Sequence, residues 1–197
     1  MRNIFLLAAG LCLPLPTMAA DASYLDALYT FSANLEVSDP GLGSEKFDGR
    51  GYGVRGVAAL SDSLVLTGEY QSISYDGAAE DSKQTRLGVG LTGATPSGLY
   101  LEYIRLDTGG TPINGYGVHA RFESNESPSR LYAQVGYINL NGPTENAKGL
   151  EYLVGLTFPV FGSTSGFIDY RKNSLKGADS KMESDVADLR AGVRFSF

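Results

Sequence analysis

The sequence predicts an all-β protein, a closed antiparallel up-and-down transmembrane β-barrel, and three observations lead to this fold class. Apolar and polar side chains alternate with a period of two along most of the chain, as they do on strands with one apolar face. Glycine (25 residues) and tyrosine (12 residues) are abundant, which favours strands and turns over helices. Beyond the first residues, no apolar run reaches the length that a membrane-spanning helix requires.

Residues 1–20 have the composition of a cleaved secretory signal peptide, which leaves 21–197 as one barrel domain. Arg2 supplies positive charge, an apolar run follows at 4–15, and small residues surround Ala20, where we expect cleavage. Cleavage after Ala19 or Ala22 is the alternative. The single cysteine, Cys12, lies in this leader, so the exported domain is expected to have no disulfide.

Period-two patterning predicts ten strands, with eight as the alternative count. The expected ranges are 25–37, 50–60, 64–74, 82–92, 99–106, 116–123, 131–137, 150–158, 166–171 and 185–197. Compact turns at 61–63, 93–98, 124–129 and 159–164 alternate with segments that are on the whole longer and more polar, at 38–48, 76–81, 107–115, 140–148 and 172–184. Membrane barrels show this alternation, with short periplasmic turns and longer extracellular loops.

The apolar face is expected to meet lipid, whereas a lipocalin-like barrel or a β-sandwich would turn it inward. In 25–37 every odd position, from Leu25 to Val37, is assigned to this face. Tyrosines gather at the strand ends nearest the longer loops: Tyr52, Tyr70, Tyr103, Tyr116, Tyr137, Tyr152 and Tyr170. The opposite ends carry Tyr29, Phe31, Phe122, Phe158, Phe195 and Phe197. Two aromatic belts around an aliphatic band are typical of the girdles of a membrane barrel.

The polar face combines small residues with charges of both signs, as a narrow lumen requires. Its expected charge network is Arg55, Glu69, Arg86, Glu102, His119, Arg121, Glu151, Asp169, Arg171, Asp188 and Arg190, with Arg194 beyond it. Buried charges must be paired, and the arginine fork suits carboxylates. We therefore expect a charged lumen that is largely filled by side chains.

Near the C-terminus a polar residue is followed by glycine two positions on and then by two aromatics at alternate positions. These residues are Arg190, Gly192, Phe195 and Phe197. The pattern resembles the C-terminal assembly signal of Gram-negative outer-membrane β-barrels, and the likeness covers the whole exported chain. It implies location in the Gram-negative outer membrane, contact with its lipid and lipopolysaccharide, and handling by periplasmic chaperones and the barrel-assembly machinery. We expect a monomer, and the net charge of −6 argues against a nucleic-acid partner.

The favoured function is a structural or surface-interaction barrel, and the alternative is a narrow porin-like channel for small solutes. Barrels of eight strands have an interior filled by side chains, and barrels of sixteen strands enclose a channel. A barrel of ten strands is closer in size to the filled kind. A third possibility is an enzyme acting on lipid A or peptides, with His119 as general base. Outer-membrane lipid A deacylases place a serine two residues after the histidine, where this chain has Arg121, and no carboxylate pair of the omptin protease type stands out. We therefore expect no enzyme, no cofactor and no metal site.

Overall fold

The computed structural model describes residues 23–197 except 42, 79, 93–96, 125–127, 143–144 and 179–181. The strands are β1 Tyr24–Asp39, β2 Gly43–Ala59, β3 Leu64–Tyr75, β4 Ser82–Thr92, β5 Gly98–Asp107, β6 Ile113–Glu123, β7 Arg130–Asn141, β8 Asn146–Phe161, β9 Thr164–Gly177 and β10 Glu183–Ser196. In this part of the chain, no helix is long and apolar enough to cross a membrane. The expected signal peptide and its cleavage site lie outside the described residues.

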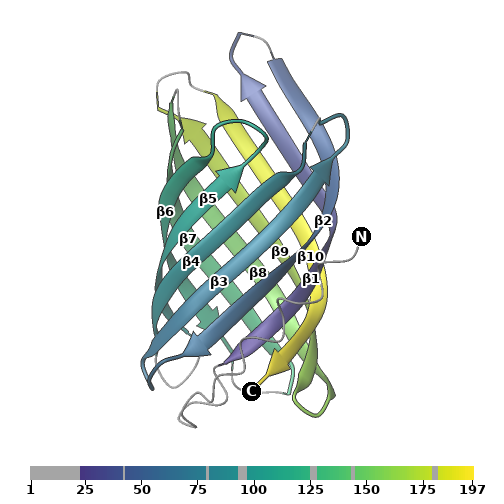
Figure 1. The fold of residues 1–197 in the computed structure, drawn as a ribbon, viewed down its shortest axis with the longest axis vertical. Helices are drawn as coiled ribbons and strands as arrows, with labels where there is room; N and C mark the ends of the chain where they lie inside the picture. Colours follow the sequence, from purple (N-terminus) through teal and green to yellow (C-terminus); the bar gives the residue numbers. More distant parts are fainter. Residues whose placement is uncertain are drawn as a thin grey trace.

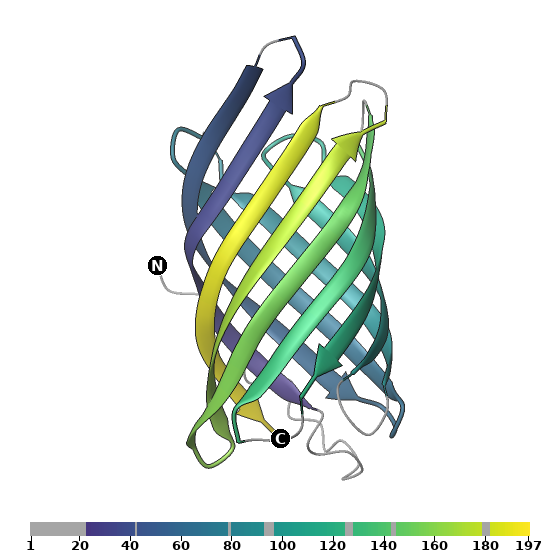
Figure 2. The same ribbon diagram turned by 180° about the vertical axis from the view of Figure 1, so that it is seen from behind.

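The strands form one closed antiparallel barrel in which each strand pairs with its neighbours in sequence, and β1 pairs with β10 (Figures 1 and 2). The predicted fold class is confirmed, and the strand count is ten rather than eight. At the β1–β10 seam Tyr24 lies opposite Ser196, so the start of β1 and the end of β10 lie at the same rim of the barrel. We call this rim the terminal end, and the opposite rim, with the β1–β2 connection, the loop end.

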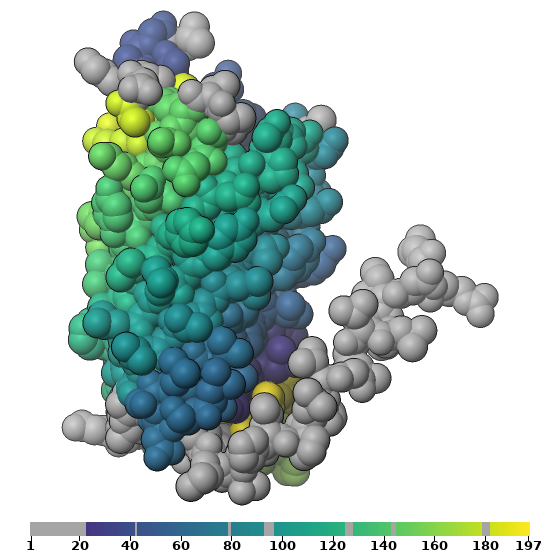
Figure 3. All heavy atoms as spheres, turned by 60° about the vertical axis from the view of Figure 1, so that its left-hand side comes forward, coloured from purple at the N-terminus to yellow at the C-terminus, as the bar shows by residue number. Residues whose placement is uncertain are grey.

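Strands at the loop end are longer than expected, and the connections between them are correspondingly shorter. Most of 38–48, 140–148 and 172–184, which were assigned to longer loops, is strand. The polarity that suggested loops belongs to outward side chains of these strands, such as the exposed ion pair of Lys176 and Glu183. In the projecting β1–β2 hairpin (Figure 3), Glu36 pairs with Lys46 at 3.2 Å on this outer face. A hydrogen bond from Ser44 and the ammonium of Lys46 lower the pKa of the Glu36 carboxyl.

A β-bulge at Phe31 reverses the two faces of β1. The pairing with β10 shifts register between Thr30 and Ser32, and the pairing with β2 shifts between Thr30 and Ala33. Thr30 is buried, Phe31 and Ser32 are both exposed, and Ala33 is buried again. Because a one-residue insertion exchanges inside and outside, the following apolar residues enter the lumen. The expectation that 33, 35 and 37 share the lipid-facing side with Leu25 is therefore wrong.

The expected belt residues lie on the outer wall, and most of them are exposed. Among the tyrosines, only Tyr103 is half-buried, because it packs edge-on against Tyr116 and donates a hydrogen bond to Asn114 at 2.7 Å. Phe122, Phe158 and Phe195 are exposed at the terminal end. The expected separation of the two belts is wrong at one point. Tyr29 and Tyr52, assigned to opposite belts, are direct partners across β1 and β2.

Candidate functional site

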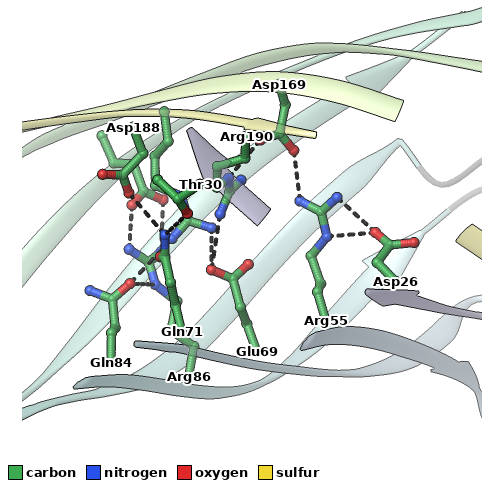
Figure 4. A network of polar contacts seen from close by, with 12 residues as sticks. Asp26, Thr30, Arg55, Glu69, Gln71, Gln84, Arg86, Asp169, Asp188 and Arg190 are labelled. Atoms are coloured by element: carbon green, nitrogen blue, oxygen red, sulfur yellow. Dashed lines mark hydrogen bonds and ion pairs between the residues drawn. The ribbon is translucent and has the colours of Figure 1, made fainter. Parts of the chain in front are cut away.

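The lumen nearest the terminal end is filled by arginines and carboxylates that pair with one another (Figure 4). Strand alternation aims these side chains inward, since each lies next to an outward apolar residue in the sequence. The residues expected there lie on this inner face, and all except the half-buried Glu102 are buried: Arg55, Glu69, Arg86, His119, Arg121, Glu151, Asp169, Arg171, Asp188 and Arg190. We call the ion-paired members of this set, together with their partners, the lumen network; among the described residues, Asp188 has a hydrogen bond from Gln71 but no ion pair.

Asp169 of β9 joins three elements of the lumen network. Its Oδ1 accepts a hydrogen bond from Arg190 Nε at 2.6 Å, and its Oδ2 accepts one from Arg55 Nη1 at 3.1 Å. The Tyr132 hydroxyl also donates to Oδ2, at 2.9 Å. The carboxylate is only 2% exposed, so these donors replace the water that a charge of this kind would otherwise need.

Asp26 of β1 connects the two strands that flank it. Arg55 of β2 donates to its Oδ2 through Nε at 2.9 Å, and Arg194 of β10 donates to its Oδ1 through Nε at 2.8 Å. Arg194 also stacks on Tyr24, with the guanidinium carbon 3.6 Å from the ring centroid. Asp26 is fully buried, so the β1–β10 seam contains a charge pair inside the barrel as well as its backbone ladder.

Glu69 of β3 pairs with two arginines from the other side of the barrel. Its Oε1 accepts hydrogen bonds from Arg171 Nη2 and from Arg190 Nη1, the latter at 3.2 Å. Arg171 of β9 also donates to Gln84 of β4 at 3.2 Å. Since β2, β1 and β10 lie between β3 and β9 along the sheet, these bonds cross the lumen rather than follow its wall.

A second crossing joins Arg86 of β4 to Glu151 of β8. The guanidinium donates to both carboxylate oxygens, through Nη1 at 2.8 Å and through Nη2. Arg86 also reaches Glu102 at 3.5 Å. His119 stands between the two acids, 3.3 Å from Glu102 and 3.4 Å from Glu151, but neither contact has hydrogen-bond geometry.

Two glycines make room for the His119 ring. A Cβ at Gly136 would lie 2.0 Å from His119 Nδ1, and one at Gly117 would lie 2.4 Å from Nε2. The ring is 1% exposed, and the two glycines approach both of its nitrogens. These glycines are therefore required by the close approach of a side chain.

We expect Gly136→Ala to lower the free energy of unfolding by about 1–3 kcal/mol, the usual range for overpacking. Chemical denaturation of the barrel in lipid vesicles measures it. Gly56→Ala is the matched control, since the nearest atom to its Cβ would be 3.6 Å away. Adding His119→Ala should remove most of the Gly136→Ala effect, because the clashing ring is gone. Equal losses at both glycines would contradict this account.

The terminal end of the lumen is narrowed by aromatic rings beneath arginines. Arg121 stacks on Tyr132 at 4.5 Å and binds Glu123 at 3.2 Å. The cavity within the lumen network has a volume of about 50 Å³. Arg55, Glu69 and Arg86 are among the residues that line it. Such a volume holds a few waters and no ordinary solute.

The loop end of the lumen has a different character. A cavity of about 530 Å³ opens there, and most of its wall is apolar. The bulge in β1 supplies Leu35 and Val37 to this wall, and β5 and β7 supply Ile104 and Ile138. We call this space the loop-end cavity. A charged lumen was expected along the whole barrel, and this apolar section was not anticipated.

Sequence reasoning also missed partners within the lumen network. Asp26 lies on the polar face of the first strand and, with ten strands in register, falls opposite both Arg55 and Arg194. Aligning the polar positions of the expected strand 25–37 with those of the expected strands 50–60 and 185–197 would have identified Asp26 as a partner of these arginines. The side chain of Tyr132 also points into the lumen. In the sequence, only its position next to the outward Leu131 indicates this direction.

The residues of the expected assembly signal are divided between the two faces of β10. Arg190 is fully buried in the lumen network, whereas Phe195 and Phe197 are exposed on the outer wall. A Cβ at Gly192 would lie 2.1 Å from the carbonyl oxygen of Ala27, so a larger residue would disturb the seam. Phe197 donates its backbone N–H to Ser23 at 3.2 Å, which extends the seam beyond the last strand pair.

Within the described residues, no three of His, Cys, Asp and Glu are grouped in a way that would hold a metal ion. The comparisons with protein-family models and with curated proteins give no match. Solved structures do match. The outer membrane protease OmpT from Escherichia coli is 10% identical and has a TM-score of 0.52, over 92% of this chain and 98% of that one. The chain has the fold of an outer-membrane β-barrel.

Two further solved structures are similar over most of their length. Neisserial surface protein A is 19% identical with a TM-score of 0.43, over 89% of this chain and 97% of that one. Ail, the attachment invasion locus protein of Yersinia pestis, is 15% identical with a TM-score of 0.36, over 88% and 99%. At these identities the likeness concerns the fold, and function has to be argued from the lumen and its rims.

Proposed function

We propose that the chain is an integral protein of the Gram-negative outer membrane with a sealed lumen and a structural or surface-interaction role. The pairing of arginines with carboxylates across the lumen carries this proposal. Arg86 with Glu151 and Arg171 with Glu69 connect opposite walls, and the space left between them is about 50 Å³. Hydrated solutes would have to break these pairs to pass, and breaking a buried pair is strongly unfavourable.

Single-channel recording in planar bilayers tests the seal. We expect no current steps of reproducible size from the purified barrel, because the lumen network blocks the path. The double variant Arg86→Ala, Glu151→Ala removes one crossing and should produce such steps. Lys172→Ala, Asp185→Ala removes an ion pair of 3.1 Å on the outer face and is the matched control. Stable steps of one size from the unaltered protein would contradict the seal.

A narrow channel for small solutes is the second candidate function. The loop-end cavity supports it, since about 530 Å³ of the lumen is hollow at that end. The lumen network lies between this cavity and the terminal end, which is why the sealed barrel is preferred. The recording described above separates the two functions.

The proposed role is not catalytic. His119 is the only histidine, and its ring lies between Glu102 and Glu151 of the lumen network, 1% exposed, where a peptide or a lipid A headgroup has no access. Its acidic neighbours Glu102 and Glu151 are engaged with Arg86. Incubation with lipopolysaccharide and with peptide libraries should yield no product; a product that disappears in His119→Ala would overturn this part of the proposal.

The exposed aliphatic band and its aromatic belts support contact with membrane lipid and, at the loop end, with lipopolysaccharide. We propose a monomer that engages no nucleic acid. Periplasmic chaperones and the barrel-assembly machinery would deliver it, with Phe197 as part of the recognised signal.

Phe197→Asp should therefore reduce the amount of barrel in the outer membrane severalfold, measured by fractionation and heat-modifiable gel mobility. Phe161→Asp is the control, since Phe161 is an equally large apolar side chain, 84% exposed, in another strand. Unchanged outer-membrane levels of the Phe197 variant would count against recognition of this residue.

A further inference from the structure

The loop-end cavity has an apolar wall above a polar floor. Ile73, Ile104, Leu140 and Leu175 belong to the wall. Gln71, Gln84, Asn173 and Asp188 line the cavity where it meets the lumen network. Its volume of about 530 Å³ lies within the range of about 300–1,000 Å³ that is usual for small-molecule sites.

Two acceptor atoms on the floor have no donor among the described residues. They are Oδ1 of Asp188 and Oδ1 of Asn173. Both side chains are more than nine-tenths buried, with 4% of Asp188 and 7% of Asn173 exposed. They lie close together on β10 and β9, because Asp188 is opposite Arg171 and Asn173 is opposite Val186. A buried carboxylate or amide oxygen that lacks a donor is unfavourable, so this pair favours a ligand that supplies one.

Asp188 differs from the other acids of the lumen in its pairing. Arg171, its partner in register, donates to Glu69 and Gln84 instead. Among the described residues, only Gln71 donates a hydrogen bond to Asp188, from Nε2 to Oδ2 at 3.4 Å. The same Nε2 is closer to Thr30, at 2.9 Å (Figure 4). The described arginines therefore leave this carboxylate without an ion pair, at the bottom of an apolar space.

We propose that the loop-end cavity is a binding site for a small apolar molecule with one hydrogen-bond-donating head, an amine or an alcohol. The apolar part lies against Ile104, Ile138 and Leu140, and the head donates to Asp188 and Asn173. A carboxylate head is rejected, because it would bring a second negative charge to Asp188 and offers no donor. The proposal rests on the sealed barrel in one respect: the ligand enters and leaves at the loop end.

Methyl-resolved NMR of the barrel in lipid nanodiscs tests this site with three water-soluble probes, hexylamine, hexanol and hexanoate. The methyls of Ile73, Ile104 and Ile138 report on the cavity, and Ile168, exposed on the lipid-facing wall, reports on partition into the membrane. We expect saturable shifts of the three cavity isoleucines with hexylamine, hexanol or both, no saturable shift with hexanoate, and little change at Ile168. If only hexylamine binds, the ligand is an amine; if only hexanol binds, it is an alcohol.

Three variants of β10 and one of β9 locate the contacts. Val186→Trp fills the cavity and should abolish saturable binding, whereas Val193→Trp, on the outer face of the same strand, should leave it intact. Asp188→Asn should weaken hexylamine at least tenfold, because it removes the charge from the strongest acceptor. Asn173→Leu should weaken hexanol. Each variant is first shown to keep the heat-modifiable mobility of a folded barrel.

Several results would overturn the proposal. They are equal binding of hexanoate, shifts that follow Ile168 without saturation, retention of binding in Val186→Trp, or failure of both donor probes. Bilayer recording on the same preparation keeps the two proposals separate. If no probe binds and no current steps are recorded, the ligand site is contradicted and the sealed lumen is not. If a probe binds and current steps are recorded, the sealed lumen is contradicted and the ligand site is not.

Discussion

Replacing Asp169 with alanine should lower the free energy of unfolding of the barrel by about 3–5 kcal/mol, the usual effect of removing one partner from a buried ion pair. Arg55 and Arg190 would each lose an acceptor, at 3.1 and 2.6 Å, inside the barrel. Arg190 is fully buried, so water does not reach it without opening of the wall. Urea titration of protein folded in lipid vesicles measures the change.

Asp185→Ala is the matched control for this prediction. Asp185 pairs with Lys172 at 3.1 Å on the outer face, where both side chains are about two-fifths exposed. Exposed pairs contribute about 0–1 kcal/mol, so this variant should unfold almost as the unaltered protein does. A similar loss in both variants would mean that the lumen network is hydrated and weakly coupled.

Val135→Arg should destabilise the barrel by about 2–4 kcal/mol, as arginine does near the middle of the bilayer. Val135 faces outward on β7 between Leu131 and Tyr137, within the apolar band. Asn139→Arg places the same charge on the same face of the same strand, but beyond Tyr137. We expect that position to lie at the water interface, where the effect should be at most about 1 kcal/mol.

The comparison between Val135→Arg and Asn139→Arg locates the membrane surface on the barrel. Equal effects of the two variants in lipid would place both residues at one depth. No effect of Val135→Arg would mean that this face does not meet lipid. The folded fraction against urea, with tyrosine fluorescence as the signal, is the measurement for both.

Much of the fold was predictable because alternation with a period of two is a local property of the sequence. In Leu64–Tyr75, for example, Leu66 and Tyr70 face out and Glu69 and Gln71 face in, as their order indicates. Alternation failed at Phe31, since a bulge is decided by the pairing with β2 and β10 and leaves the apolar period of the strand unbroken. The result is that Leu35 and Val37 enter the lumen.

The lumen network was predictable as a set of residues but not as a set of pairs. Arg86 with Glu151 and Arg171 with Glu69 are separated by three strands along the wall, so their partners depend on the diameter and stagger of the closed barrel. The loop-end cavity was not predictable for a related reason. Its wall combines inward residues from most of the strands. The stretch 71–84 supplies several of them, but the rest come from segments that lie far apart in the sequence.

The β1–β10 seam has a consequence for the order in which the barrel folds. Every other strand pair joins neighbours in sequence and can form as a hairpin, whereas Tyr24 and Ser196 close a loop of almost the whole domain. Contacts at such a separation are slow to form, because chain entropy must be lost before they stabilise anything. The ion pair between Asp26 and Arg194 forms only at this step. Closure is therefore the late event, and until it occurs the sheet keeps two open edges.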